Sequence, residues 1–244
     1  MKAQVLSLAR RPDRLNRFMG WNHAHGLDFT IMPAMDGRTL NRADLVAQNL
    51  LHPDHALFTD GAVGAALSHR AQWQACIEEG LPRLILEDDA CLRHGFAAHA
   101  QGVLAALGQA DMVFLGYNTD APLTLLVDEG MFSAVYFHLP ARDAAAFQRY
   151  AHQACALPRP GLFTAALVWG ALAYAVTPKG ARLLLERCFP LRAVGVHIHA
   201  EKRVVQANGI DGLMNWAIQQ GGLRAQVCYP PLAIGPNDMS DVQP

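Results

Sequence analysis

The sequence predicts an α/β fold with a mostly parallel sheet that is covered by helices on both faces. Short apolar runs typical of buried strands alternate with segments typical of helices through the first half of the chain. The 244 residues are 52% hydrophobic and 17% charged, without repeats, which is typical of one globular domain. Ligands of such sheets bind beyond the carboxyl ends of strands, so residues that follow strands are the first site candidates.

The first elements follow from local signals. Residues 3–8 are expected to form a buried strand, and Pro12 suits the first turn of a helix over residues 13–25. Residues 29–32 form a second short strand that leads into a turn at Asp36 and Gly37. This pattern places the polar residues after position 8 at the carboxyl end of the first strand.

The next helix has clear signals at both ends. Thr59 or Asp60 can cap it, and Gly80 can end it at about residue 79. The strand over residues 83–87 follows. The later elements that we expect are a helix over residues 94–107, strands over 112–116 and 172–176, a helix capped by Thr177 with Pro178 at its first position and ending near 188, a helix over 211–219, a strand over 226–228, and a loop or wrapping arm from 230 onward.

Three adjacent acids, Glu87, Asp88 and Asp89, come directly after the apolar residues 84–86. Carboxylates near a buried strand end need a counter-charge, because removing one from water without a partner costs several kcal/mol. A divalent cation that carries a diphosphate would supply that charge, and Mg²⁺ and Mn²⁺ prefer hard oxygen ligands. The alternative is a solvated acidic turn after a core strand.

Two further segments have two interpretations each. The basic cluster Arg10, Arg11, Arg14 and Arg17 is either an anion site near the first strand or a solvated helix face. The small residues at 61–66 allow either close packing of a helix or the approach of a ligand to its backbone. On the same helix, Ser68 and His69 are either pocket residues or hydrogen-bonded core residues.

Charge and cysteine content narrow the function classes. The formal net charge of −1 argues against a broad nucleic-acid-binding surface. The five cysteines are scattered, with no Cys-x-x-Cys pair, so neither a zinc site nor a disulfide framework is expected. We expect no signal peptide at the N-terminus, and residues 161–177, the longest uncharged stretch, to be core rather than a membrane span. The scattered cysteines and the expected lack of a signal peptide favour a location of the protein in a reducing cytoplasm.

Five segments in order resemble glycosyltransferase family 25, the bacterial lipopolysaccharide and lipooligosaccharide glycosyltransferases, which are related to collagen galactosyltransferase domains. The segments are VLSLARRPDR (5–14), PAMDGR (33–38), GAVGAALSHRAQW (61–73), LILEDDA (84–90) and AYAVTPKGARLL (173–184). The resemblance covers residues 3–90 and 170–234, and residues 117–165 show none. It implies a GT-A-like, Rossmann-like fold in a single domain over 1–244. Residues 1–118 would be the nucleotide-sugar-binding half, and 119–244 the acceptor-side half and C-terminal tail.

The resemblance also implies a donor site with a Mn²⁺ or Mg²⁺ cofactor. Glu87, Asp88 and Asp89 would act in the manner of an Asp-x-Asp motif, with Asp89 the best direct metal ligand and Glu87 the second candidate. Glu87 and Asp88 would otherwise contact the water shell of the metal or the ribose hydroxyls, and the sequence leaves open which of the three acids coordinates directly. The family more often has Asn where this chain has Ser7, which weakens one expected contact to the nucleotide. The residues that the resemblance assigns to donor binding are Leu8, Arg10, Arg11, Arg14, Asp36, Gly37, Ser68, His69, Glu87 and Asp88.

Inverting transfer needs a general base for the acceptor hydroxyl. Asp211 lies where family members carry a matching acid, and the alternative role for it is an N-terminal helix cap. Asp120 and Asp128 are weaker candidates for the base. His197 and His199 could share one face of a strand and bind metal, but no other ligands accompany them in the sequence.

The expected function is therefore that of an inverting, metal-dependent glycosyltransferase. By resemblance it would move galactose from UDP-galactose to a lipooligosaccharide or lipopolysaccharide acceptor. The implied partners are a UDP-sugar and a glycan or glycolipid, with no nucleic acid and with peripheral membrane contact through the acceptor. The implied location is the cytoplasm, or the inner face of the inner membrane. The alternatives are a non-catalytic carbohydrate- or nucleotide-binding module on the same fold, and a metal-independent enzyme.

Overall fold

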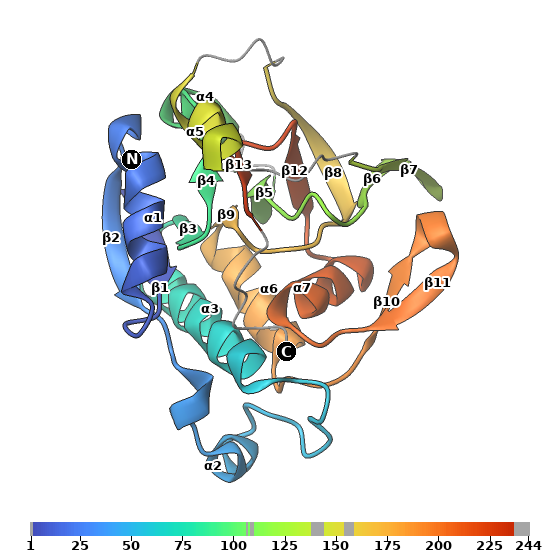
Figure 1. The fold of residues 1–244 in the computed structure, drawn as a ribbon. Helices are drawn as coiled ribbons and strands as arrows, with labels where there is room; N and C mark the ends of the chain where they lie inside the picture. Colours follow the sequence, from blue (N-terminus) through green and yellow to red (C-terminus); the bar gives the residue numbers. More distant parts are fainter. Residues whose placement is uncertain (1, 106, 108–109, 138–143, 154–158, 237–244) are drawn as a thin grey trace.

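The computed structural model describes residues 2–105, 107, 110–137, 144–153 and 159–236. In these residues one sheet of eleven strands crosses the molecule (Figure 1). Its strands are β1 (Lys2–Ser7), β2 (Asp28–Pro33), β3 (Arg83–Glu87), β4 (Cys91–Leu92), β5 (Met112–Gly116), β6 (Leu123–Asp128), β7 (Met131–Val135), β8 (Gly161–Leu167), β9 (Ala173–Val176), β12 (Ala225–Tyr229) and β13 (Ala233–Ile234). A separate hairpin pairs β10 (Gly195–Ile198) with β11 (Arg203–Gln206).

The order along the sheet is β2-β1-β3-β9-β5-β12-β8-β6-β7. The strands β2, β1 and β3 run parallel, as do β5 and β12. The strand β9 lies antiparallel between β3 and β5, and β8, β6 and β7 continue the sheet with antiparallel pairs. The predicted α/β class is confirmed, and strands from both predicted halves of the chain join in one mixed sheet.

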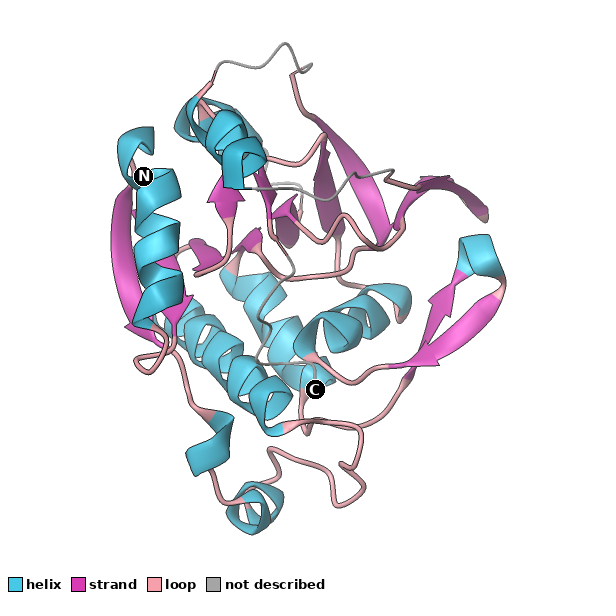
Figure 2. Ribbon diagram, viewed as in Figure 1, coloured by secondary structure: helices cyan, strands magenta, loops and turns pink. Residues whose placement is uncertain are grey.

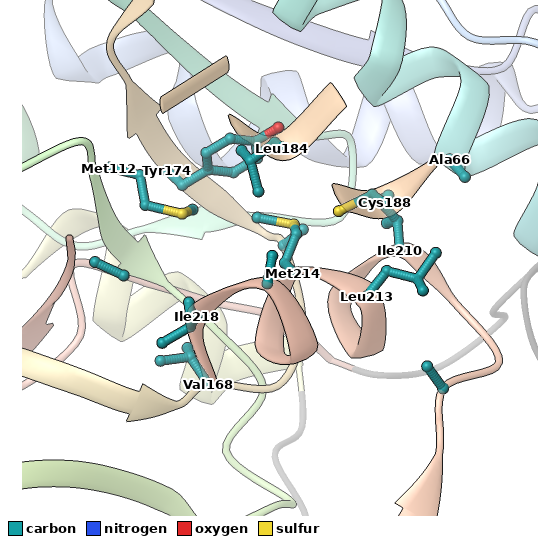
Figure 3. Close-up of a cluster of buried hydrophobic side chains, with 14 of the residues drawn as sticks. Ala66, Met112, Val168, Tyr174, Leu184, Cys188, Ile210, Leu213, Met214 and Ile218 are labelled. Carbon is teal, nitrogen blue, oxygen red and sulfur yellow. The ribbon is translucent and has the colours of Figure 1, made fainter. Parts of the chain in front are cut away.

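Helices cover both faces of the sheet (Figure 2). They are α1 (Pro12–Asn22), α2 (Arg42–Ala47), α3 (Asp60–Glu79), α4 (Phe96–Ala105), α5 (Ala144–His152), α6 (Pro178–Cys188) and α7 (Ile210–Gln219). On one face α3, α6 and α7 pack on a core that includes Ile85 and Tyr174, and Figure 3 shows part of this cluster. On the other face α1 and α4 pack on a core that includes Leu84 and Leu86. Successive residues of β3 therefore enter opposite cores, as the two-residue period of a strand requires.

The predicted helix signals are confirmed. The hydroxyl of Thr59 accepts a hydrogen bond from the backbone N–H of Ala62 at 3.1 Å, so Thr59 rather than Asp60 caps α3. Gly80 ends α3 with a φ of +68°. Thr177 caps α6 by accepting from the N–H of Gly180 at 3.1 Å. The first helix ends at Asn22, and a 3₁₀ turn follows where the prediction continued the helix.

Several helices and strands of the structure were not predicted, because their local sequence signals are weak. The hairpins β6–β7 and β10–β11, the helix α5 and the two-residue strands β4 and β13 lack a long periodic pattern. The expectation of a loop or arm after residue 230 is wrong at β13, which pairs antiparallel with β4 and contacts Gly116 of β5. Residues 237–244 of that tail lie outside the described residues.

The structure bears on two further expectations, that residues 161–177 are core rather than a membrane span and that the cysteines form no disulfide framework. None of the helices in the described part of the chain is long and apolar enough to span a bilayer. Residues 161–177 contain β8 and β9, and β9 is completely buried, whereas Phe163 of β8 is 43% exposed. Four cysteines, Cys76, Cys91, Cys188 and Cys228, are free. Cys155 lies outside the described residues.

The last residue of α1 holds the segment that follows β3. Asn22 is fully buried, and its amide donates to the carbonyl of Ala90 at 2.8 Å. Its side-chain oxygen accepts from the N–H of Leu92 at 2.9 Å. Both ends of the amide are thus bonded to the chain just past the acids, so α1 fixes the course of the acidic segment.

We expect Asn22→Ala to lower the free energy of unfolding by about 2 kcal/mol, because it leaves a buried carbonyl and a buried N–H without partners. Urea unfolding measures this change. Asn16→Ala, at an exposed position of the same helix, is the matched control and should change stability by less than about 0.5 kcal/mol. Equal stability of the two variants would contradict the structural role of Asn22.

Candidate functional site

A pocket with about 570 Å³ of empty space, part of it open to solvent, lies at the carboxyl ends of β1 and β3. Its walls come from the segments after β1 and β2, from the first three turns of α3, and from the end of β3. Nine of the ten residues that the sequence assigned to donor binding line it: Leu8, Arg10, Arg14, Asp36, Gly37, Ser68, His69, Glu87 and Asp88. Arg11 and the proposed metal ligand Asp89 are not among the lining residues.

One wall depends on a close approach of two backbones. A Cβ atom on Gly37 would lie 1.7 Å from the carbonyl oxygen of Asp60, and one on Gly64 would lie 2.4 Å from that of Met35. Ser68 secures the contact, because its hydroxyl accepts from the N–H of Met35 at 2.8 Å and donates to the carbonyl of Gly64 at 2.7 Å. The small residues of α3 therefore serve packing at Gly64, and this packing forms the pocket wall.

The acids after β3 have a counter-charge within the chain. The guanidinium of Arg14 lies 2.6 Å from Oδ1 of Asp88 and 3.0 Å from Oδ2 of Asp89. The hydroxyl of Ser7 donates to Oδ2 of Asp88 at 2.7 Å. All of these charged side chains are largely buried. Arg14 thus supplies part of the positive charge for which the sequence predicted only a cation.

Two other arginines of the cluster, Arg10 and Arg11, differ in their relation to the pocket. Arg10 lines the pocket and contacts Asp36 at 2.9 Å, and Arg38 contacts the same carboxylate at 2.7 Å. The hydrogen bond from Arg38 accordingly holds the pKa of Asp36 below its usual range. Arg11 is the N-cap of α1 and does not line the pocket; it pairs with the exposed Asp13 at 2.9 Å, and 17% of its own side chain is exposed.

Carboxylate oxygens are suitable ligands for a hard divalent cation, but the described side chains do not provide a complete set of ligands around one position. The Oδ1 atom of Asp89 is buried and has no hydrogen-bond partner among the described residues. Burial, followed by the charge of Glu87, raises the pKa of Asp89. No group of three or more His, Cys, Asp or Glu side chains in the described ranges has a metal-binding arrangement. A cation held by Asp89 and Glu87 would need further ligands from a diphosphate and water.

His69 combines both roles that the sequence left open. Its side chain is 1% exposed and yet lines the pocket. Its Nε2 atom lies 3.1 Å from Oε1 of Glu87, and its Nδ1 atom lies 2.9 Å from the hydroxyl of Tyr174. Burial is the largest single influence on Glu87 and opposes its ionisation, but His69 and Arg14 together outweigh burial, so the pKa of Glu87 is lowered. His69 thus links the core to a pocket carboxylate.

Asp211 is the second residue of α7, whose N-cap is Gly209, so the predicted alternative of an N-cap role is wrong. Its Oδ2 accepts from the N–H of Gly170 at 3.0 Å, and its Oδ1 accepts from the N–H of Gly212 at 2.8 Å. The carboxylate therefore ties α7 to the loop between β8 and β9. Burial raises the pKa of Asp211, and the negative charge of Glu87 raises it further.

The weaker candidates lie elsewhere. Asp120, in the connection from β5 to β6, and Asp128, at the end of β6, are both exposed. His197 belongs to β10, whereas His199 begins a 3₁₀ turn and stacks on Phe132 with the ring centroids 4.1 Å apart. The expectation that both histidines belong to a strand is wrong, because the strand ends at residue 198, but their rings do lie together, stacked with the centroids 6.0 Å apart.

Sequence reasoning missed two residues that support the site. Asn22 stands at a helix end with no special pattern around it, and Tyr174 stands in an apolar run typical of a core strand. A polar tyrosine in the middle of a fully buried strand is a usable signal, because its hydroxyl needs a partner.

Comparison with known proteins places this chain in a family. The sequence model of Glycosyltransferase family 25 (LPS biosynthesis protein) matches residues 1–197. The chain is 29% identical over 194 residues to mouse "Inactive glycosyltransferase 25 family member 3", a match that covers 74% of this chain and 28% of that protein. It is 27% identical over 124 residues to human "Procollagen galactosyltransferase 2", covering 46% and 20%. The chain spans less than a third of the length of these relatives. With four-fifths of its residues matched by the family model, it belongs to glycosyltransferase family 25.

Proposed function

We propose that this chain is an inverting glycosyltransferase that moves a sugar, galactose, from UDP-galactose to a glycan or glycolipid acceptor of the lipooligosaccharide or lipopolysaccharide class. The observation that carries the proposal is the pocket at the ends of β1 and β3, where Arg10 and Arg14 lie beside carboxylates and Arg14 contacts the acids that follow β3. A nucleoside diphosphate bound with a cation needs positive and negative groups in the same place. The choice of galactose is supported by the similarity of part of this chain to human procollagen galactosyltransferase 2.

The donor would bind through residues that are already held in place. Arg10 is fixed by Asp36, and Arg14 is fixed by Asp88 and Asp89, so little side-chain entropy would be lost when these guanidinium groups meet phosphate oxygens. Gly61, in the first turn of α3, lines the pocket, and the positive end of a helix dipole favours an anion there.

Asp89 and Glu87 are the residues that would hold Mn²⁺ or Mg²⁺. The cation would neutralise charge on the departing diphosphate. The unpartnered Oδ1 of Asp89 supports this assignment.

Asp211 would accept the proton of the acceptor hydroxyl. Two backbone N–H groups hold its carboxylate in a single orientation. Its raised pKa makes it a stronger base than an exposed aspartate, and Glu87 is close enough to contribute to that rise. Membrane contact in this proposal is peripheral and runs through the acceptor lipid, at the cytoplasmic face of the inner membrane.

A non-catalytic binding module on the same fold is the second candidate. The observation that favours it is Arg14, which already pairs with two of the acids and supplies part of their counter-charge without a cation. Partial relatives in mouse and human carry the word "inactive" in their names. This candidate predicts glycan or nucleotide binding without transfer.

Calorimetry with UDP in the presence and absence of Mn²⁺ tests the proposal. We expect Mn²⁺ to raise the UDP affinity of the unmodified protein by about tenfold, or about 1.4 kcal/mol. Asp89→Ala should remove that gain. Asp13→Ala, which removes an exposed, arginine-paired carboxylate of α1 outside the pocket, should keep it.

The outcomes separate the candidates. UDP affinity that does not respond to Mn²⁺, together with transfer from UDP-galactose, would point to a metal-independent enzyme. Glycan binding with neither UDP binding nor transfer would favour the binding module.

A further inference from the structure

A buried chain of hydrogen bonds runs beneath the pocket. The indole Nε1 of Trp73 lies 2.8 Å from the hydroxyl oxygen of Tyr174, and that hydroxyl lies 2.9 Å from Nδ1 of His69. The Nε2 atom of His69 then reaches Oε1 of Glu87 at 3.1 Å. Trp73 and Tyr174 are completely buried, and Figure 3 shows Tyr174 among apolar side chains such as Met112 and Leu184.

The direction of the chain follows from the number of protons available. The indole N–H of Trp73 can only donate, so the hydroxyl oxygen of Tyr174 accepts. The single hydroxyl proton of Tyr174 is then donated to Nδ1 of His69, which must be unprotonated. A neutral imidazole that accepts at Nδ1 carries its proton at Nε2, and this N–H donates to Glu87.

The alternative protonation states leave groups unsatisfied. A proton on Nδ1 would leave the hydroxyl proton of Tyr174 without an acceptor among the described residues. If that imidazole were neutral, its Nε2 lone pair would also face the carboxylate of Glu87. Unpaired buried polar groups of this kind cost about 1 to 3 kcal/mol each. The arrangement therefore selects the Nε2–H tautomer of His69.

We propose that Tyr174 and Trp73 are positioning residues of the donor pocket, which fix the tautomer of His69 so that it holds the Glu87 carboxylate toward the pocket. The inference rests on the proposed function, in which Glu87 contacts the donor or its cation. Among the four hydrogen-bonded residues Trp73, Tyr174, His69 and Glu87, only Glu87 has substantial exposure, at 29% of its side chain, and it lines the pocket. This series of hydrogen bonds thus lets buried core residues set the orientation of Glu87, the side chain that would contact the ligand.

A core role alone does not explain Tyr174. Phenylalanine would fill the same apolar space without a hydroxyl that needs two partners. Partners of residues that contact a ligand or metal orient them, and losing such a partner typically costs about 10- to 100-fold in affinity. Tyr174→Phe removes only the oxygen at the centre of the chain, so it isolates this contribution.

The test uses protein labelled with ¹⁵N-histidine, in which nitrogen chemical shifts report the tautomer of His69 without any ligand. We expect the Nε2–H tautomer in the unmodified protein and loss of that single tautomer in Tyr174→Phe. The affinity for UDP with Mn²⁺, measured by calorimetry, should fall about tenfold in this variant. Tyr117→Phe is the matched control, since Tyr117 is equally buried and its hydroxyl donates to the carbonyl of Cys228 at 3.1 Å, outside the pocket. It should change neither the His69 signal nor the affinity.

Two results would overturn the proposal. One is a His69 that carries its proton on Nδ1, or on both nitrogens, in the unmodified protein, a measurement that does not depend on any variant folding. The other is a folded Tyr174→Phe protein whose UDP affinity equals that of Tyr117→Phe. If the unmodified protein bound no UDP, the proposed function would fail. The tautomer measurement would still test the hydrogen-bond arrangement of Trp73, Tyr174 and His69, because it needs no ligand.

Discussion

Gly64→Ala is expected to lower the free energy of unfolding by about 3 kcal/mol and to abolish UDP binding. Alanine is the better helix former by about 1 kcal/mol, so helix propensity alone predicts the opposite sign. Packing decides the outcome, because the new Cβ would lie 2.4 Å from the carbonyl oxygen of Met35 and 2.6 Å from the backbone nitrogen of Gly37. These are backbone atoms, so the whole segment that carries Met35, Asp36 and Gly37 would have to leave α3. Urea unfolding and calorimetry with UDP measure the two effects.

Gly20→Ala is the matched control for this variant. Gly20 also lies inside a helix, α1, but a Cβ there meets nothing within 4 Å. This substitution should stabilise the protein by up to about 1 kcal/mol and leave UDP binding unchanged. If Gly64→Ala proved as stable as Gly20→Ala, the wall of the pocket would not depend on the contact between Gly37 and Gly64.

Asp211→Asn is expected to reduce sugar transfer by about 100-fold, the usual scale for loss of a general base, while UDP affinity remains within about twofold. The amide keeps the size of the side chain but cannot take a proton at neutral pH. It also presents an NH₂ group to one of the two N–H donors, of Gly170 or Gly212, so we expect a loss of about 1 to 3 kcal/mol of stability as well. Transfer is therefore assayed well below the unfolding temperature, beside a binding measurement.

The pH dependence of transfer gives a second measurement on the same residue. A base works when it is unprotonated, so the rate should rise as pH rises through the pKa of Asp211. Burial and then Glu87 raise that pKa, so this rise should occur above the range usual for aspartate, and it should be absent from Asp211→Asn. Asp120→Asn and Asp128→Asn are the controls and should retain transfer. Turnover near the unmodified level in Asp211→Asn, with loss in either control, would move the base to that residue.

Much of the fold was predictable because its signals are local. The apolar runs that became β1, β3 and β5 need only their own burial to be recognised, and Thr59 and Thr177 cap their helices through atoms three residues away. The position of the acids Glu87 and Asp88 at a strand end, and hence their place in a pocket, follows from the same reasoning.

What the sequence by itself determined, then, is the α/β class, most of the longer helices and strands, and, through the family resemblance, nine of the residues that line the pocket. Only the tertiary structure decided what those residues contact. Arg14 meets Asp88 and Asp89, and His69 joins Tyr174 to Glu87, across separations along the chain that no local pattern encodes. The physical reason is that such pairs exist only after helices and strands have packed. Desolvation then forces each buried charge or hydroxyl to take the partner that packing brings within reach.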